Sequence, residues 1–161
     1  MGRERKATPG GAETPPPDPD MPPEDEMTVV EHMQKLLEAE RSRVICLEQL
    51  AFLSPNKDVN RMLSSFRNDA STACEMLHSM IMQRDGYPSP EISGLAQDIM
   101  DLSSMEEMID FLVKDEMDVV RQIEEIPPEE LTEAEKSYFE GLWHQHKRTI
   151  EMCKMLLGGG R

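Results

Sequence analysis

Three interruptions of unequal length divide the chain and constrain its fold more than any other feature. SPN (54–56) and PPEE (127–130) are short, and each follows a long stretch with helical periodicity. The interruption that opens with DGYPSP at Asp85 extends to Leu102 and has room for one short helix over 92–100. Proline and glycine end helices at such places. A short, a long and a short connection predict a four-helix bundle in which one crossover joins two helical hairpins.

Four long helices are predicted between these interruptions, over about 28–53, 57–84, 104–126 and 132–157. Thr28 is placed to cap the first helix. Capping boxes open the last two helices, through Ser104 with Glu107 and Thr132 with Glu135. The apolar content comes mostly from aliphatic residues and 14 Met, with only 4% aromatic residues, which favours helices over sheets. We therefore predict an all-α domain over 28–157.

The ends of the chain differ from this domain. Residues 1–27 hold most of the prolines and almost no apolar side chains, so we expect a disordered, acidic tail. The tail could instead dock on a partner, which the sequence does not identify. The Gly-rich residues 158–161 are predicted to end the last helix.

The net charge of −15, the apolar runs and the cysteines indicate which partners and which location to expect. It repels phosphate backbones, so no nucleic-acid partner is expected. No stretch approaches 18 apolar residues, so no membrane partner is expected. Three separated cysteines without a Cys-x-x-Cys pattern indicate free thiols and a cytoplasmic location. A homodimer that forms through a Met-containing helix is compatible with the sequence.

Three polar residues interrupt the apolar stripes of the predicted helices. At about 100° per residue, Glu40, Glu116 and His146 point inward on the first, third and fourth helices. Each lies within about one turn of its helix centre, which predicts a shared layer at mid-depth. Asp69 lies at the edge of the second stripe and could join them. The pair Glu75 and His78 has the Glu-x-x-His spacing of di-iron bundles but points outward.

Two interpretations of this layer are open. Carboxylate and imidazole ligands suit Fe, Mn or Zn, so Glu40, Glu116 and His146, with Asp69 beside them, could hold a metal ion. The same residues could instead form a buried Glu–His hydrogen-bond cluster without metal, joined by Arg43 or Arg121. The protein would then be a non-catalytic structural or interaction bundle.

A complete di-iron site lacks half of its ligands. Such a site needs Glu and His one turn apart on two helices, but the inward pairs are Ala70 with Ala73 and Trp143 with His146. If metal binds, a single ion is therefore expected. The Met residues around His78 suggest copper only weakly, because Met at helical spacing is typical of core packing. No phosphate-binding loop or hydrolase motif occurs, and the sequence leaves any enzymatic activity open.

Several short motifs resemble the ferritin-like superfamily, and more closely a small, uncharacterised bacterial ferritin-like domain family. They are LLEAER (36–41), DASTACEML followed by GYPS (69–89), VVR (119–121) and the spacing of His146, Ile150 and Cys153. This resemblance implies a ferritin-like four-helix bundle without an established reaction, and a link to oxidative or metal stress. It carries Glu40, Glu116 and His146 over as metal ligands. The resemblance also implies an acidic residue at the position of Ala70, and this chain departs from the family there.

Overall fold

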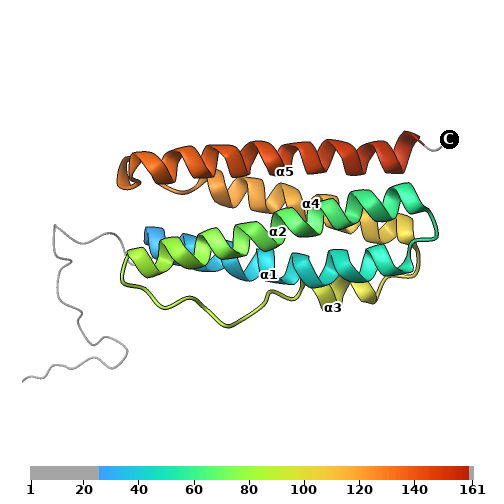
Figure 1. Ribbon diagram of the computed structural model, residues 1–161, viewed down its shortest axis with the longest axis horizontal. Coiled ribbons are helices and arrows are strands. Elements are labelled where there is room, and N and C mark those ends of the chain that lie inside the picture. Colours follow the sequence, from blue (N-terminus) through green and yellow to red (C-terminus); the bar gives the residue numbers. More distant parts are fainter. Residues whose placement is uncertain (1–25, 160–161) are drawn as a thin grey trace, which may run out of the picture.

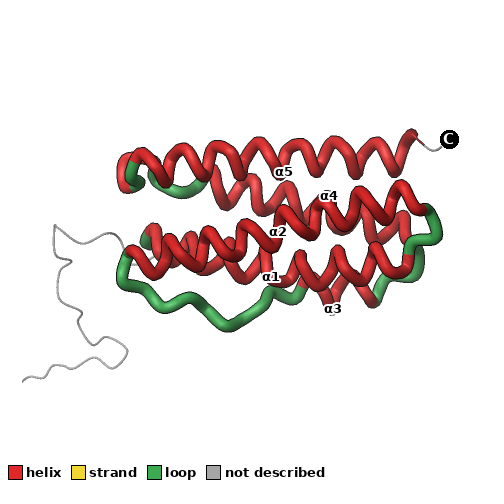
Figure 2. The backbone as a smooth tube through the Cα atoms, in the orientation of Figure 1, coloured by secondary structure: helices red, strands yellow, loops and turns green. Residues whose placement is uncertain are grey.

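The computed structural model describes residues 26–159 and contains two helical hairpins. The first joins α1 (Val29–Leu53) to α2 (Lys57–Gln83), and the second joins α4 (Met105–Glu124) to α5 (Glu133–Gly159). A short helix, α3 (Leu95–Met100), lies in the crossover, and a 3-10 turn (Pro128–Glu130) lies before α5. The long helices lie side by side along one axis (Figure 1). Figure 2 shows only helices and loops within the described part of the chain, which confirms the all-α prediction.

The predicted helix boundaries agree with the structure to within a few residues, apart from the crossover and the C-terminal end. The crossover helix begins at Leu95 instead of residue 92. Helix α5 extends through Gly159, two residues past the predicted end at 157, because glycine disfavours a helix without forbidding it. The predicted disordered tail lies outside the described residues, except for its last two positions.

Side-chain caps fix where the helices begin. Thr28 and Glu31 form a complete capping box at α1. At α5, the Thr132 amide donates to Glu135 at 2.9 Å and the Glu135 amide donates to Thr132 Oγ1 at 3.1 Å, as predicted. The predicted box at Ser104 is half wrong. Ser104 Oγ accepts from the Glu107 amide, as predicted. The carboxylate of Glu107, however, accepts its hydrogen bonds from the amide and the hydroxyl of Ser103.

Replacing Thr132 with alanine is expected to lower the free energy of unfolding by about 1 kcal/mol, because the first turn of α5 loses its cap. Urea denaturation measures this loss. The control is Ser79→Ala at an exposed position inside α2, where alanine is the better helix former. Equal losses in the two variants would show that the box does not stabilise α5.

The crossover is tied to α1 by hydrogen bonds. Gln34 donates to the carbonyl of Tyr87 at 2.5 Å and accepts from the amide of Ser89 at 2.6 Å. Farther along, the Ala96 amide donates to Ser42 Oγ at 3.0 Å. From the end of α2 the connection runs back along the bundle, so that α4 starts near the end at which α2 starts (Figure 1).

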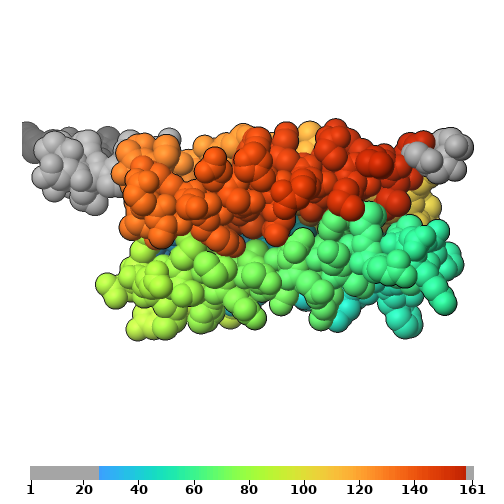
Figure 3. Space-filling view, turned by 45° about the horizontal axis from the view of Figure 1, so that its top comes forward, coloured from blue at the N-terminus to red at the C-terminus, as the bar shows by residue number. Residues whose placement is uncertain are grey.

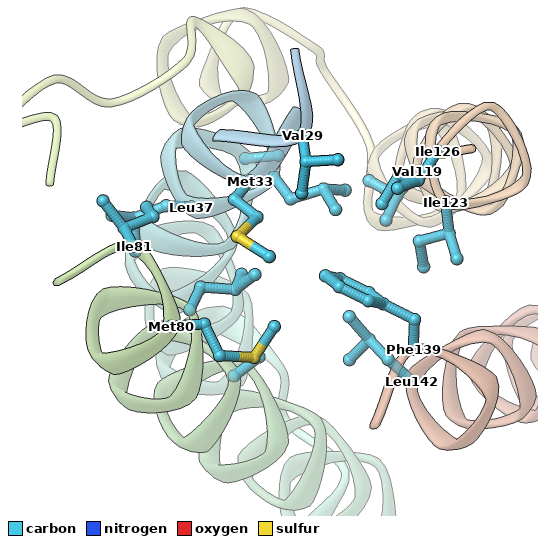
Figure 4. Close-up of a cluster of buried hydrophobic side chains, with 14 residues drawn as sticks. Val29, Met33, Leu37, Met80, Ile81, Val119, Ile123, Ile126, Phe139 and Leu142 are labelled. Carbon is cyan, nitrogen blue, oxygen red and sulfur yellow. The ribbon is translucent and has the colours of Figure 1, made fainter. Parts of the chain in front are cut away.

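Two hydrophobic clusters fill the bundle, one toward each end. The first cluster contains side chains from all four long helices, including Val29, Met80, Ile123 and Phe139 (Figure 4). The second cluster contains Cys46, Phe66, Leu112, Ile150 and Cys153, among others, and the crossover helix packs against it. The polar residues predicted to lie at mid-depth belong to neither cluster. They occupy the level at which one hydrophobic cluster gives way to the other.

Candidate functional site

Five polar residues from three helices meet at the centre of the bundle, and we call them the central cluster. Glu40 and Arg43 come from α1, Asp115 and Glu116 from α4, and His146 from α5. Four of them are almost completely buried, with exposed fractions between 0% and 4%, and Asp115 is partly exposed. The structure therefore brings Glu40, Glu116 and His146 together, with Arg43 between the carboxylates.

His146 bridges two carboxylates through its two ring nitrogens. Nδ1 lies 2.5 Å from Glu116 Oε1, and Nε2 lies 2.7 Å from Glu40 Oε2. Burial lowers the pKa of His146, but the charges of Glu40 and Glu116 and their hydrogen bonds outweigh burial and raise it to about 10. At neutral pH the ring is therefore an imidazolium that donates from both nitrogens.

Arg43 is the second cation of the cluster. Its Nη1 donates to Glu40 Oε1 at 2.9 Å, and its Nη2 donates to Asp115. Its Nε lies 2.8 Å from Glu116 Oε2, but the angle there does not suit a hydrogen bond, so this contact is an ion pair only. Burial lowers the pKa of Arg43, and the three carboxylates raise it by more, which keeps the guanidinium charged.

The charges of the buried residues balance. Burial raises the pKa of Glu40, but the charges of His146 and Arg43 outweigh burial and lower it, so Glu40 is ionised at neutral pH. Two cations thus face the carboxylates of Glu40 and Glu116. Burial raises the pKa of Asp115 despite its contact with Arg43. Buried charges are tolerated only when they are paired in this way, because each ion loses several kcal/mol of hydration.

The other residues considered from sequence lie outside the cluster. Among the described residues Asp69 makes no ion pair or hydrogen bond with it, although it lines the same small cavity. Arg121 is largely exposed and pairs with Asp118, so Arg43 is the arginine that joins the layer. Glu75 and His78 are exposed, as predicted from their helical phase.

Helix α2 contributes no polar ligand to the centre. Ala70 and Ala73 are buried there with exposed fractions of 3% and 2%. On α5, one turn before His146, the indole nitrogen of Trp143 donates to Glu124 at 2.8 Å and does not reach the cluster. The three positions at which a di-iron bundle needs further ligands are therefore occupied by Ala70, Ala73 and Trp143, whose side chains do not bind metal.

The arrangement of the central cluster does not fit a metal ion. Within residues 26–159, no group of three or more His, Cys, Asp or Glu side chains is disposed to hold one. Both nitrogens of His146 are directed at carboxylates. Arg43 lies between the carboxylates, at the position that a metal ion bound by them would take. The free cavity at the cluster is about 10 Å³, roughly the space of one water molecule.

The fold and this buried layer place the chain among the ferritin-like four-helix bundles. A solved structure described as "Crystal structure of ferritin like, diiron-carboxylate proteins from Bacillus anthracis str. Ames" is similar, with a TM-score of 0.70 and 16% identity over 81% of this chain and 95% of that chain. At this identity the likeness concerns the fold alone. The chain belongs to the family "Domain of unknown function (DUF6306)", whose sequence model matches residues 27–155. The predictions of a ferritin-like fold and of a family without an established function are thus confirmed.

Two further findings concern curated proteins and membrane-spanning helices. No curated protein matches the sequence significantly. Within the described part of the chain, no helix is both long enough and apolar enough to cross a membrane.

Proposed function

We propose that this protein is a metal-free ferritin-like bundle that acts as a non-catalytic binding protein. In this proposal Arg43 and protonated His146 replace the metal cations that carboxylates at the centre of such a bundle would otherwise bind. The observation that carries it is the position of Arg43, which contacts Glu40, Asp115 and Glu116 at once.

Charge and space support this proposal. A metal ion would have to displace a guanidinium from three carboxylates and a proton from His146, whose pKa is raised to about 10. Metal binding by imidazole requires the neutral ring, so proton loss opposes binding at neutral pH. The cavity of about 10 Å³ has the space of about one water molecule, so an ion there could not keep several water ligands while Arg43 stays in its present position.

A second candidate function is the binding of a single Fe, Mn or Zn ion by Glu40, Glu116 and His146, with Asp69 as an additional ligand. It is favoured by the convergence of the first three side chains and by the description of the structural neighbour as a diiron-carboxylate protein. In this case Arg43 would have to leave the cluster. No reaction or substrate follows from this candidate.

Metal analysis distinguishes the two functions. The protein, purified without chelator and without a metal-affinity tag, is analysed for Fe, Mn and Zn before and after incubation with each ion. We expect far less than one ion per chain in every case, since Arg43 and His146 already balance the carboxylates. Near-stoichiometric metal would overturn the metal-free proposal. Any metal that Glu116→Gln abolishes would be assigned to the cluster, whereas without metal this variant changes stability only.

A further inference from the structure

A groove runs along the bundle between α2 and α5, where the two helices make few contacts. Figure 3 shows this seam between the green and the orange-to-red helices. The groove contains two hollows, of about 450 Å³ and 310 Å³, and Asp69 and Gln145 line both. Small-molecule sites commonly start at about 300 Å³, so each hollow is large enough for a compact ligand.

Small side chains keep the groove open. Ala73 on α2 and Gly141 on α5 both line the smaller hollow, and a Cβ atom added to Gly141 would meet no atom within 4 Å. Ala73 and Ala70 stand where a di-iron bundle would have larger ligands on this helix. Of these two alanines, Ala73 also lines the smaller hollow.

Asp69 lines both hollows and, like Arg148 in the larger one, forms no ion pair among the described residues. Arg148 lines the larger hollow without forming an ion pair with it. Arg61, at the far end, is paired with Asp58 at 3.1 Å. Burial raises the pKa of Asp69, although the charges of Arg148 and His146 oppose this effect. A partly desolvated carboxylate of this kind gains from a cation that enters the groove.

The walls beside Asp69 are largely apolar. Met62, Phe66 and Met152 line the larger hollow, next to the side chain of Gln145. Phe66 is buried beneath the surface and provides an aromatic wall. The larger hollow therefore combines the carboxylate of Asp69, the guanidinium of Arg148 and the amide of Gln145 with an apolar wall on one side.

We propose that this groove binds a small organic amine, with its ammonium group on Asp69 and its apolar part in the hollow beside Phe66. The net charge of −15 attracts cations to the protein and repels anionic ligands. A neutral ligand of the same shape would fill the hollow but leave Asp69 without a partner. The inference rests on the proposed function, because it names the class of ligand that the metal-free bundle would bind.

Three probes of one shape test this proposal: phenethylamine, phenethyl alcohol and hydrocinnamate, which carry a positive, a neutral and a negative end. Each is titrated into the isotope-labelled protein at neutral pH and followed by NMR. We expect the amine to bind about tenfold more tightly than the alcohol and to shift resonances of α2 and α5 around Asp69, with the acid weakest. Equal affinity for amine and alcohol, or absence of saturable amine binding, would overturn the proposal.

Matched variants separate the groove from the overall charge. Asp69→Asn is expected to weaken amine binding about tenfold, to the level of the alcohol. Glu75→Gln removes the same charge from an exposed position of the same helix and should leave the amine affinity unchanged. Equal effects of the two variants would mean that the amine responds to net charge and not to this site. Metal content is measured separately, so amine binding by a metal-loaded protein would refute the metal-free function and leave this site in place.

Discussion

Replacing Arg43 with methionine is expected to lower the free energy of unfolding by about 3–5 kcal/mol, because it leaves buried carboxylates without their counterion. Methionine keeps much of the volume and removes the charge. Arg43 contacts Glu40, Asp115 and Glu116, and its own exposed fraction is 2%, so water cannot take its place without opening the bundle. Urea denaturation at neutral pH measures the loss.

The control is Arg61→Met, also on a long helix and also in an ion pair. Arg61 and Asp58 have exposed fractions of 78% and 88%, and exposed pairs contribute at most about 1 kcal/mol. A loss for Arg43→Met as small as that for Arg61→Met would contradict the role given to the central cluster.

A second substitution sharpens this experiment. Glu116→Gln removes one of the carboxylates that Arg43 compensates, so its cost should be smaller in the Arg43→Met background than in the natural protein. The two residues are in contact, and contacting residues typically show coupling energies of about 0.5–3 kcal/mol. Strictly additive losses would show that the two charges do not stabilise one another.

Helical phase was sufficient to predict which carboxylates and which histidine point inward, because a rigid backbone sets the direction of each Cβ atom. Helical phase alone was not sufficient to predict that the guanidinium of Arg43 lies at the centre of the bundle. Leu36, Arg43 and Leu50 are seven residues apart and lie on one buried face, and this spacing was the available signal. A long arginine side chain can bury its stem and still reach water, so the spacing alone could not assign its guanidinium to the centre.

The sequence was sufficient to predict that α2 lacks metal ligands. It was not sufficient to predict the groove between α2 and α5. Ala70 and Ala73 are evident at the positions of the missing ligands. That Ala73 borders an open groove depends on how closely α2 approaches α5, and this distance is set by side chains along both helices. From its place at the edge of the second apolar stripe, Asp69 could have joined the central layer. Its position in the groove became clear only from the packing of the two hairpins.

The stability of the protein is expected to fall as pH rises between about 6.5 and 10, because the folded protein holds the proton of His146 more tightly than the unfolded chain. Its pKa is raised from 6.5 to about 10. A raised pKa contributes stability that is fully present below the unfolded value and is lost as pH rises through the folded value. Each pKa unit corresponds to about 1.4 kcal/mol, so the contribution amounts to a few kcal/mol. Urea denaturation over this pH range measures the slope.

His146→Gln tests whether this slope belongs to the central cluster. Glutamine can still donate to one carboxylate but does not titrate, so the variant should be less stable at neutral pH and lose stability less steeply toward pH 10. His144→Gln is the control, because His144 lies two residues away on the same helix and is exposed. It should retain the full slope, since lysines, tyrosines and cysteines titrate equally in both variants. An unchanged slope in His146→Gln would mean that His146 is neutral in the folded protein, and the balance of two cations against two buried carboxylates would then be wrong.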